Sequence, residues 1–303
     1  MIKINKIRKY DNFEPSLLQC DAFFFGKVVD QRTEFVSKNI STSDGITISY
    51  LKEEASVLMN GTIINIIDYI NHSMFNSYVK VVIDSTSLDF PELLYTFYAL
   101  NESKSIKEII VLYIEPSSYS SKKGILEEDE DFELSEGKNK FITLPVFSIN
   151  SSQTKKSENV LLSFLGFENS RLGQILAEDD GALYGKLLNM VAVPAFKAGW
   201  ENNSLRKHMV YFDHLNTELL LYPGNNPYEV INKLNKLYEA YNNVIIAAIG
   251  TKPSTLAAAL FLVNKIKYNN PSKRVGAIHD FPVKTRDRSV GIGPISIYTL
   301  GKI

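Results

Sequence analysis

Short apolar segments alternate with segments of helical character along the C-terminal half of the chain, and this alternation limits the possible folds more than any other feature. The apolar segments are uniformly hydrophobic, which is typical of parallel strands that are covered by helices on both faces. Strands are expected at residues 160–165, 190–196, 218–222 and 244–249, with a helix after each. Two final strands, at 274–281 and 295–300, are expected to form an antiparallel hairpin at one edge. The sequence therefore predicts an α/β fold with a mainly parallel sheet.

The N-terminal half repeats this plan in shorter form. In each half a strand leads into a polar loop, a second strand leads into a polar turn and a helix, and a third strand ends in an acidic residue that proline follows closely. These features lie at residues 30–33, 84–87 and 115–116 in the first half, and at 166–171, 250–252 and 280–282 in the second. Three features in the same order suggest the duplication of a βα domain.

A polar stretch at residues 149–159 separates the two halves. It is rich in small residues and lies between two apolar segments, at 141–148 and 160–165, so it is interpreted as a surface connection. We therefore expect two Rossmann-like domains with mainly parallel sheets, at residues 1–150 and 158–303.

Composition and charge narrow the class of partner. The 303 residues have a formal net charge of -1, which gives no general attraction to long nucleic acid or to an anionic membrane surface. A small anionic ligand in a local basic pocket is the more plausible partner. Cys20 is the single cysteine, which excludes an internal disulfide framework and a cysteine-based metal site. With neither a signal-type segment nor a membrane-spanning segment in the sequence, we expect a soluble cytoplasmic protein.

The turn at Gly250, Thr251 and Lys252 is the strongest candidate for a ligand site. It lies between a buried strand and a helix, and open α/β sheets bind ligands at the carboxyl ends of their strands. Lys252 at a helix start can neutralise a phosphate, while Thr251 and Ser254 can donate hydrogen bonds. Gly250 lets a ligand approach the backbone closely. The alternative is that the turn is only a helix entry, with Thr251 or Ser254 as the N-cap.

The polar loop that follows the strand at residues 160–165 is the second candidate. It carries Gly166, Glu168, Asn169 and Arg171. Loops that follow parallel strands gather at one edge of the sheet, so Glu168 and Arg171 are expected to lie beside the Gly-Thr-Lys turn. The alternative is a surface ion pair between Arg171 and Glu168, of little energetic consequence.

The N-terminal half carries the counterparts of both features. Its loop contains Arg32, and its turn consists of Asp84, Ser85, Thr86 and Ser87. Asp84 at the end of a strand could bind a ribose hydroxyl or a metal, whereas the alternative is that the turn caps the helix expected from Pro91. Because this turn carries an aspartate and hydroxyls in place of a lysine, only the C-terminal half is suited to an anion.

Other catalytic patterns are mostly absent from the sequence. The four histidines are scattered, and neither a phosphate-binding loop nor a dinucleotide fingerprint occurs, so no cofactor and no metal site is predicted. The acidic run at residues 127–131 is interpreted as a solvated loop. The basic segment at 284–288 could reach a ligand's phosphates or form an exposed hairpin tip. Trp200 could stack on a base or serve as partly buried packing.

The C-terminal half resembles the CRISPR-associated Rossmann fold domain, the sensor domain that binds cyclic oligoadenylates in type III antiviral systems. The resemblance rests on the expected six strands ending in a hairpin, the polar loop after the first strand and the Gly-Thr-Lys turn after the fourth. The N-terminal half resembles two-domain α/β proteins linked to bacterial defence, whose Glu-Arg-Ser-like loop and Asp-Ser-Ser-like turn correspond to residues 30–33 and 84–87. The chain differs from the first family in having Ile249 where a second glycine is usual, and no nuclease domain is expected within its 303 residues.

The resemblance implies a nucleotide-sensing or regulatory subunit of a bacterial antiviral system, which passes its signal to a separate effector or acts as a homo-oligomer. An enzyme that cleaves or modifies a nucleotide is the first alternative, with Lys252 stabilising the leaving phosphate and Glu168 or Asp84 as base. A non-catalytic scaffold subunit, in which the polar turns merely cap helices, is the second.

Overall fold

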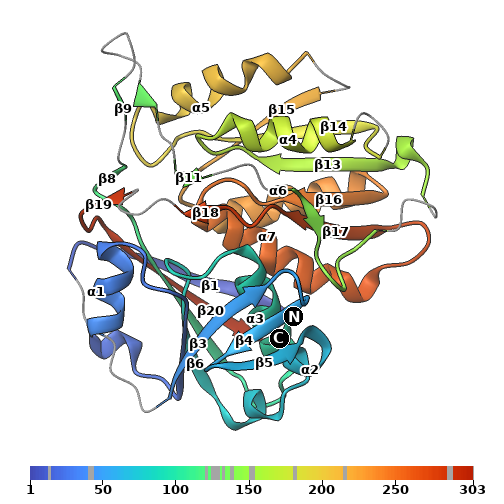
Figure 1. Ribbon diagram of the computed structural model, residues 1–303. Coiled ribbons are helices and arrows are strands. Elements are labelled where there is room, and N and C mark those ends of the chain that lie inside the picture. The colour runs from blue at the N-terminus through green and yellow to red at the C-terminus, as the bar shows by residue number, and fades with distance from the viewer. Residues whose placement is uncertain are drawn as a thin grey trace. The chain divides into compact units, whose positions relative to one another are not determined.

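The computed structural model describes most of the chain and divides it into two compact units (Figure 1). Unit 1 comprises Met1–Ser120 and Arg286–Ile303, and unit 2 comprises Ser121–Thr285. The described residues are 1–12, 15–39, 44–119, 122–123, 130–131, 134–136, 140–149, 154–179, 183–213, 217–284 and 289–302. Most of the acidic run and of the basic segment, and the middle of the polar stretch at residues 149–159, lie outside these ranges.

Unit 1 is built on an eight-stranded sheet. Its strand order is β1 (Ile2–Tyr10), β20 (Ile295–Lys302), β7 (Glu108–Ile114), β6 (Lys80–Asp84), β2 (Ala22–Phe25), β3 (Gly45–Leu51), β4 (Ser56–Met59) and β5 (Thr62–Asn65). The four strands β7, β6, β2 and β3 are parallel to one another. The strands on either side of this group, β1 and β20 at one end and β4 and β5 at the other, pair antiparallel. Because β3 and β6 lie on opposite sides of β2, the strand order reverses between β2 and β6.

The helices of unit 1 connect or follow these strands. Helix α1 (Gln31–Asn39) follows β2, α2 (Ile66–Ile70) follows β5, and α3 (Phe90–Glu102) joins β6 to β7. Short 3-10 turns cover Pro15–Leu18 and Ser73–Ser77. Helix α3 carries nine buried residues, because its sequence is apolar on most of its surface.

Unit 2 is built on a six-stranded sheet. Its strand order is β12 (Ile142–Thr143), β17 (Arg274–His279), β16 (Asn243–Ala247), β13 (Asn159–Phe164), β14 (Lys186–Ala192) and β15 (Thr217–Tyr222). The five strands from β17 to β15 are parallel, and β12 adds antiparallel to β17. In chain order these five strands are arranged 3-2-1-4-5 from β15 to β17, which is the order of the doubly wound dinucleotide-binding fold, with the reversal between β13 and β16.

Helices cover both faces of the unit 2 sheet (Figure 1). Helices α4 (Asn169–Asp179) and α5 (Trp200–His208) lie on one face, and α6 (Pro227–Ala240) and α7 (Lys252–Lys265) pack together on the other. Asn226 caps α6 by accepting hydrogen bonds from Tyr228 and Glu229, and Pro227 occupies its first turn, where a missing N–H costs nothing. The predicted α/β class is confirmed, and so is a mainly parallel sheet in unit 2; the sheet of unit 1 is mixed, because a parallel centre is flanked by antiparallel strands on both sides.

The partners of two strands differ from the prediction. The segment at residues 295–300 does not form a hairpin with 274–281; it lies in β20, between β7 and β1 of unit 1, with Ile295 opposite Ile114. Conversely, part of the segment at 141–148 lies in β12 and pairs with β17 of unit 2. Each of β7 and β17 would otherwise be an unpaired sheet edge, and each edge is covered by a strand from the other half of the sequence. Pairing between sequence neighbours was the wrong assumption.

Short two-stranded ribbons complete the described structure. β8 (Ser118–Tyr119) pairs with β19 (Ser289–Val290) in unit 1. In unit 2, β11 (Ser135–Glu136) pairs with β18 (Val283–Lys284), and β9 (Lys122–Lys123) pairs with β10 (Glu130–Asp131).

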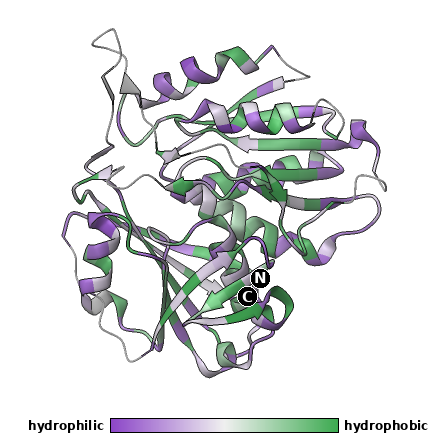
Figure 2. Cartoon of the chain, viewed as in Figure 1, coloured by the Kyte–Doolittle hydropathy of each residue, from purple (hydrophilic) through white to green (hydrophobic). Residues whose placement is uncertain are grey.

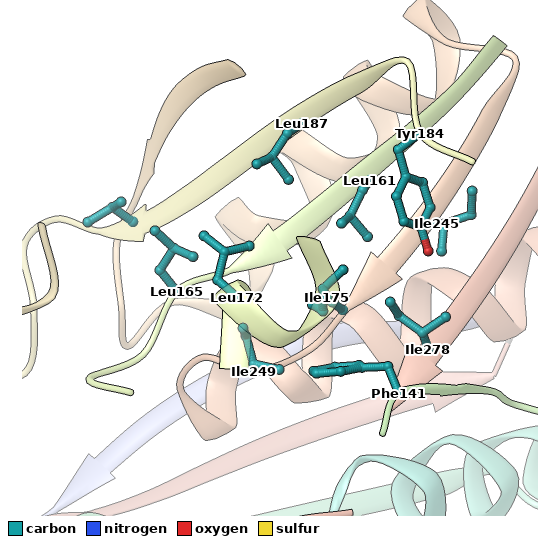
Figure 3. Close-up of a cluster of buried hydrophobic side chains, with 12 residues drawn as sticks. Phe141, Leu161, Leu165, Leu172, Ile175, Tyr184, Leu187, Ile245, Ile249 and Ile278 are labelled. Carbon is teal, nitrogen blue, oxygen red and sulfur yellow. The ribbon is translucent and has the colours of Figure 1, made fainter. Parts of the chain in front are cut away.

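The core of unit 2 lies directly beneath the candidate loops. Twelve buried residues from the sheet, α4 and flanking segments form one cluster, and the hydrophobic residues concentrate on the central strands (Figure 2). In Figure 3, Leu165, Leu172 and Ile249 lie beside one another; they come from the residue after β13, from α4 and from the turn before α7. Burial of each such side chain contributes about 1.5–3 kcal/mol, so the loops rest on a well-stabilised base. Within the described part of the chain, every helix is too short or too polar to cross a membrane.

Candidate functional site

The two candidate features of unit 2 meet where its strand order reverses. A Cβ atom on Gly166 would lie 2.8 Å from the carbonyl oxygen of Ile249, and one on Gly250 would lie 2.9 Å from the Cβ of Phe164. Both contacts are shorter than real Cβ atoms tolerate, so both positions require glycine for close packing. The loop after β13 and the turn before α7 therefore touch through their backbones, as the sequence predicted from their places on the sheet.

The start of α7 is a well-capped helix N-terminus. Thr251 is the N-cap, and its Oγ1 accepts a hydrogen bond from Ser254 N at 3.3 Å. The Thr251 hydroxyl lies 3.1 Å from the carbonyl oxygen of Gly224, and the Ser254 hydroxyl donates to the Thr251 carbonyl at 2.7 Å. Both hydroxyls thus serve the local fold, as the helix-entry interpretation required. Lys252 is a partly exposed side chain on the first residue of this 14-residue helix.

Tyr222 is a buried neighbour of this turn that the sequence analysis missed. Its hydroxyl lies 3.2 Å from the position of a Cβ on Gly250, and its ring packs edge-on against Phe164. Burial raises the pKa of Tyr222, and the neighbouring Ser254 and Thr251 partly oppose this effect. The tyrosine is the last residue of an edge strand, so its sequence context resembles that of an ordinary core aromatic.

Glu168 holds a backbone segment instead of facing Arg171. Its Oε1 accepts hydrogen bonds from Leu134 N at 3.1 Å, from Ser135 N at 2.8 Å and from the Ser135 hydroxyl at 2.7 Å. This carboxylate therefore fixes the segment that enters β11. Its assignment to a ligand or to general-base catalysis is not supported by these contacts.

Arg171 is bound to the end of β17. Its Nε and Nη2 donate to the two carboxylate oxygens of Asp280, at 2.6 and 2.5 Å. The side chains are 15% and 5% exposed, so this bidentate pair is largely desolvated. The surface pair of Arg171 with Glu168 is therefore wrong as an expectation, because a carboxylate 109 residues away in sequence lies closer in the fold.

The rest of the loop is fixed by α5. Asn169 opens α4, and its amide donates to the Lys207 carbonyl at 2.7 Å. The Ser204 hydroxyl donates to the Gly166 carbonyl, also at 2.7 Å. Asn169 therefore positions the loop, and its amide is already used within the fold.

The turn at Asp84–Ser87 in unit 1 is closed on itself. All four side chains are at most 6% exposed. Asp84 accepts hydrogen bonds from Thr86 N at 2.9 Å and from the Ser87 hydroxyl at 2.5 Å, and the Ser85 hydroxyl donates to the Leu112 carbonyl at 2.8 Å. The Thr86 hydroxyl accepts from Ile114 N at 3.0 Å. These contacts tie β6 to β7 and to the loop after β2, where Gly26 N donates to Ser87.

The turn does not cap α3, contrary to the alternative drawn from the sequence. Helix α3 begins at Phe90 with Asp89 as its N-cap. The buried turn instead lies between β2 and β6, where the strand order of unit 1 reverses. The Asp84–Ser87 turn has the same position in its sheet as the Gly-Thr-Lys turn has in unit 2, but its polar groups form hydrogen bonds within unit 1.

Arg32 belongs to a buried ion pair of unit 1. Its Nη2 lies 2.6 Å from Asp30 Oδ2, and its Nη1 donates to the Ile114 carbonyl at 3.1 Å. Asp30 also caps α1 by accepting from Thr33 N at 3.0 Å, and it accepts from the Ser289 hydroxyl at 2.6 Å. Burial raises the pKa of Asp30, but Arg32, Ser289 and Thr33 outweigh this effect and hold the pKa at about 2. The charge of Arg32 is therefore already matched, which disfavours it as an anion ligand.

Other chemistry is not evident in the described part of the chain. No group of three or more histidine, cysteine or acidic side chains there could hold a metal ion. Trp200 packs edge-on against Phe167, with Lys197 over its ring, so its role is packing. His208 is buried, its Nδ1 lies 2.8 Å from the Ser204 carbonyl, and burial lowers its pKa.

The chain matches no protein-family model, and no curated protein is significantly similar to it. The assignment of a function therefore depends on the geometry described above.

Proposed function

We propose that unit 2 binds a small anionic, nucleotide-type ligand at the edge of its sheet where β13 and β16 end. In this proposal the chain is a sensing or regulatory subunit of a bacterial antiviral system in the cytoplasm, and it passes the signal to a separate effector. The observation that carries the proposal is the backbone contact of Gly166 with Ile249 and Gly250, which brings a polar loop beside a helix that opens with Lys252.

Three physical features support an anionic ligand at this edge. The strand order reverses here, and open α/β sheets bind ligands at such reversals. The N-terminus of α7 presents the positive end of a long helix. Lys252, the first residue of that helix, adds a positive charge at the same position. The resemblance to cyclic-oligoadenylate sensor domains, which after the loss of the expected hairpin rests on the polar loop and the Gly-Thr-Lys turn, points to the same edge.

Sensing is favoured over turnover by the contacts of the acidic residues. Glu168 is bound to the 134–135 backbone, Asp280 is bound to Arg171, and Asp84 is bound within its own turn. A general base must reach the proton it removes, and these carboxylates already accept hydrogen bonds within the fold. We therefore rank an enzyme that cleaves or modifies a nucleotide as the second candidate function. Cleavage of the ligand by the isolated chain would favour that function instead.

The proposal includes an ancient duplication. Both units place a first polar loop and a polar turn where the strand order reverses, and in both an acidic residue follows the last parallel strand in chain order, Glu115 after β7 and Asp280 after β17. In this view unit 1 has kept the architecture and lost the anion site, since its turn carries Asp84 and hydroxyls in place of a lysine.

Mass spectrometry of small molecules released from the purified full-length chain tests the proposal. We expect a nucleotide-type anion to be released from the wild type, and much less from Lys252→Ala. Lys236→Ala, which removes an exposed lysine from α6, is the matched control and should retain the ligand. Added cyclic oligoadenylates should be recovered intact; recovery of cleaved products would establish the enzyme instead. If the purified chain releases no nucleotide and binds no added cyclic oligoadenylate, the proposal is refuted in favour of a scaffold.

A further inference from the structure

The ribbon formed by β11 and β18 is attached to the proposed anion site by two groups of the same loop. In the ribbon, Ser135 pairs with Lys284 and Glu136 pairs with Val283. Glu168 holds the β11 side through three hydrogen bonds on one carboxylate oxygen. Arg171 holds the β18 side, because its partner Asp280 lies three residues before Val283.

The charges make this attachment sensitive to an anion. Arg171 has a carboxylate as its bidentate partner, and a phosphate group is the other anion that fits the same fork of N–H donors. If a phosphate drew Arg171 away, Asp280 would lose its bidentate partner while its side chain is only 5% exposed, and His279 Nδ1 would remain 3.9 Å from its Oδ1. A buried carboxylate that loses its main ion-pair partner is strongly unfavourable, so the chain after β17 would have to move to hydrate it.

Unit 1 also has a two-stranded ribbon that is bound to its first polar loop, through other residues. Its ribbon pairs β8 with β19, and the Ser289 hydroxyl on β19 donates to Asp30 in the loop after β2. In unit 2 the Ser135 hydroxyl on β11 donates to Glu168 in the loop after β13. In both units a ribbon serine is thus bound to an acidic residue of the first polar loop. The β8–β19 ribbon of unit 1 is also held by Gly291 N, which donates to Gln31 Oε1 at 2.8 Å.

We propose that the β11–β18 ribbon is the output element of the anion site, held closed by Glu168 and by the Arg171–Asp280 pair, and released when an anion takes Arg171. This inference rests on the proposed function, whose ligand it couples to a structural response. In this account Arg171 contacts the anion, and Glu168 and Asp280 are positioning residues. They transmit occupancy of the Lys252 turn to a segment that a partner protein can recognise.

We call the contacts of Glu168 with Leu134 and Ser135, together with the Arg171–Asp280 pair, the latch. Hydrogen exchange of the full-length chain, without ligand, tests whether these contacts hold the ribbon. Removal of the acceptor in Glu168→Ala should increase exchange of the Leu134 and Ser135 amides about 10- to 100-fold, because hydrogen bonds to a charged group are among the stronger ones in proteins. Glu229→Ala, an exposed carboxylate on α6, is the control and should leave both amides unchanged. Equal exchange in wild type and Glu168→Ala overturns the latch.

Binding of cyclic tetra-adenylate, with inorganic phosphate as the minimal anion, tests the coupling. Because coupling is reciprocal, a loosened ribbon should raise the affinity for the anion severalfold. Ser135→Ala is the decisive variant, since it removes one latch donor and leaves every charge in place. Tighter binding in Ser135→Ala, together with faster ribbon exchange when the wild type is saturated, supports the inference. Binding with unchanged exchange overturns the coupling but leaves the anion site intact. Absence of binding to either probe, with a latch that opens in Glu168→Ala, refutes the proposed function and the coupling and leaves only a structural latch.

Discussion

Replacing Arg32 with methionine should destabilise unit 1 in a way that depends on pH. The substitution removes the guanidinium but retains most of the side-chain volume. It leaves Asp30 in its buried position, with Ser289 and Thr33 as remaining donors. The side chains of Arg32 and Asp30 are 5% and 1% exposed, so water cannot replace the lost charge without local opening. Breaking a buried pair by removing one partner costs about 3–5 kcal/mol, and we expect this loss at pH 7.

The pH dependence follows from the depressed pKa of Asp30. In the wild type this pKa falls from an ordinary 3.8 to about 2, which corresponds to about 2–3 kcal/mol of stability. That contribution is fully present above about pH 4 and is lost as the pH falls through about 2. In Arg32→Met, burial without the arginine raises the pKa of Asp30, so the variant gains stability as the carboxyl is protonated. The difference between the two proteins should therefore shrink as the pH is lowered.

Urea unfolding between pH 7 and pH 3, followed by circular dichroism, measures this difference. Arg206→Met, which removes an exposed arginine on α5, is the control and should stay within about 0.5 kcal/mol of the wild type at every pH. The fluorescence of Trp200 reports unit 2 separately, since it is the single tryptophan and lies on α5. A loss below about 1 kcal/mol at pH 7, or a loss that is the same at pH 7 and pH 3, would refute the buried ion pair.

Three further substitutions test individual contacts. Gly166→Ala places a methyl group 2.8 Å from the Ile249 carbonyl and should cost about 1–3 kcal/mol in thermal or urea unfolding, whereas Gly45→Ala, whose nearest contact is 3.4 Å, should cost clearly less. Thr251→Ala removes the N-cap of α7 and should cost about 1 kcal/mol, and no measurable loss would contradict the capping geometry. Asn189→Leu should raise the free energy of unfolding by about 1–3 kcal/mol, because neither polar atom of this fully buried amide has a hydrogen-bond partner among the described residues; a destabilised variant would indicate a bound water there.

Local features of the fold could be predicted from the sequence because they depend on local chemistry. The strand expected at 244–249 is β16, which ends at Ala247, and the helix after it opens at Lys252 behind a threonine cap. Its apolar run, polar turn and alanine-rich helix are all set by neighbouring residues. The edge on which the candidate residues gather also followed from the sequence, since loops after parallel strands must lie at their carboxyl ends.

Long-range partners could not be predicted in the same way. β20 is the most consequential case, because an apolar strand fits any unpaired edge and its own sequence does not specify which one. Arg171 and Glu168 were assigned to one ligand from their places in the loop, but their partners, Asp280 and the 134–135 backbone, are distant in sequence. The four polar residues of the Asp84 turn looked like a ligand site because a sequence does not reveal that β7 consumes their hydrogen bonds.

The central claim is that an anion binds beside the start of α7, and the affinity of Lys252→Ala tests it most directly. Titration of the full-length chain with cyclic tetra-adenylate, at fixed ionic strength, compares the wild type with Lys252→Ala and the control Lys236→Ala. Loss of one charge-assisted hydrogen bond predicts about 10- to 100-fold weaker binding in Lys252→Ala and no change in the control. Equal affinity in all three proteins would contradict the claim.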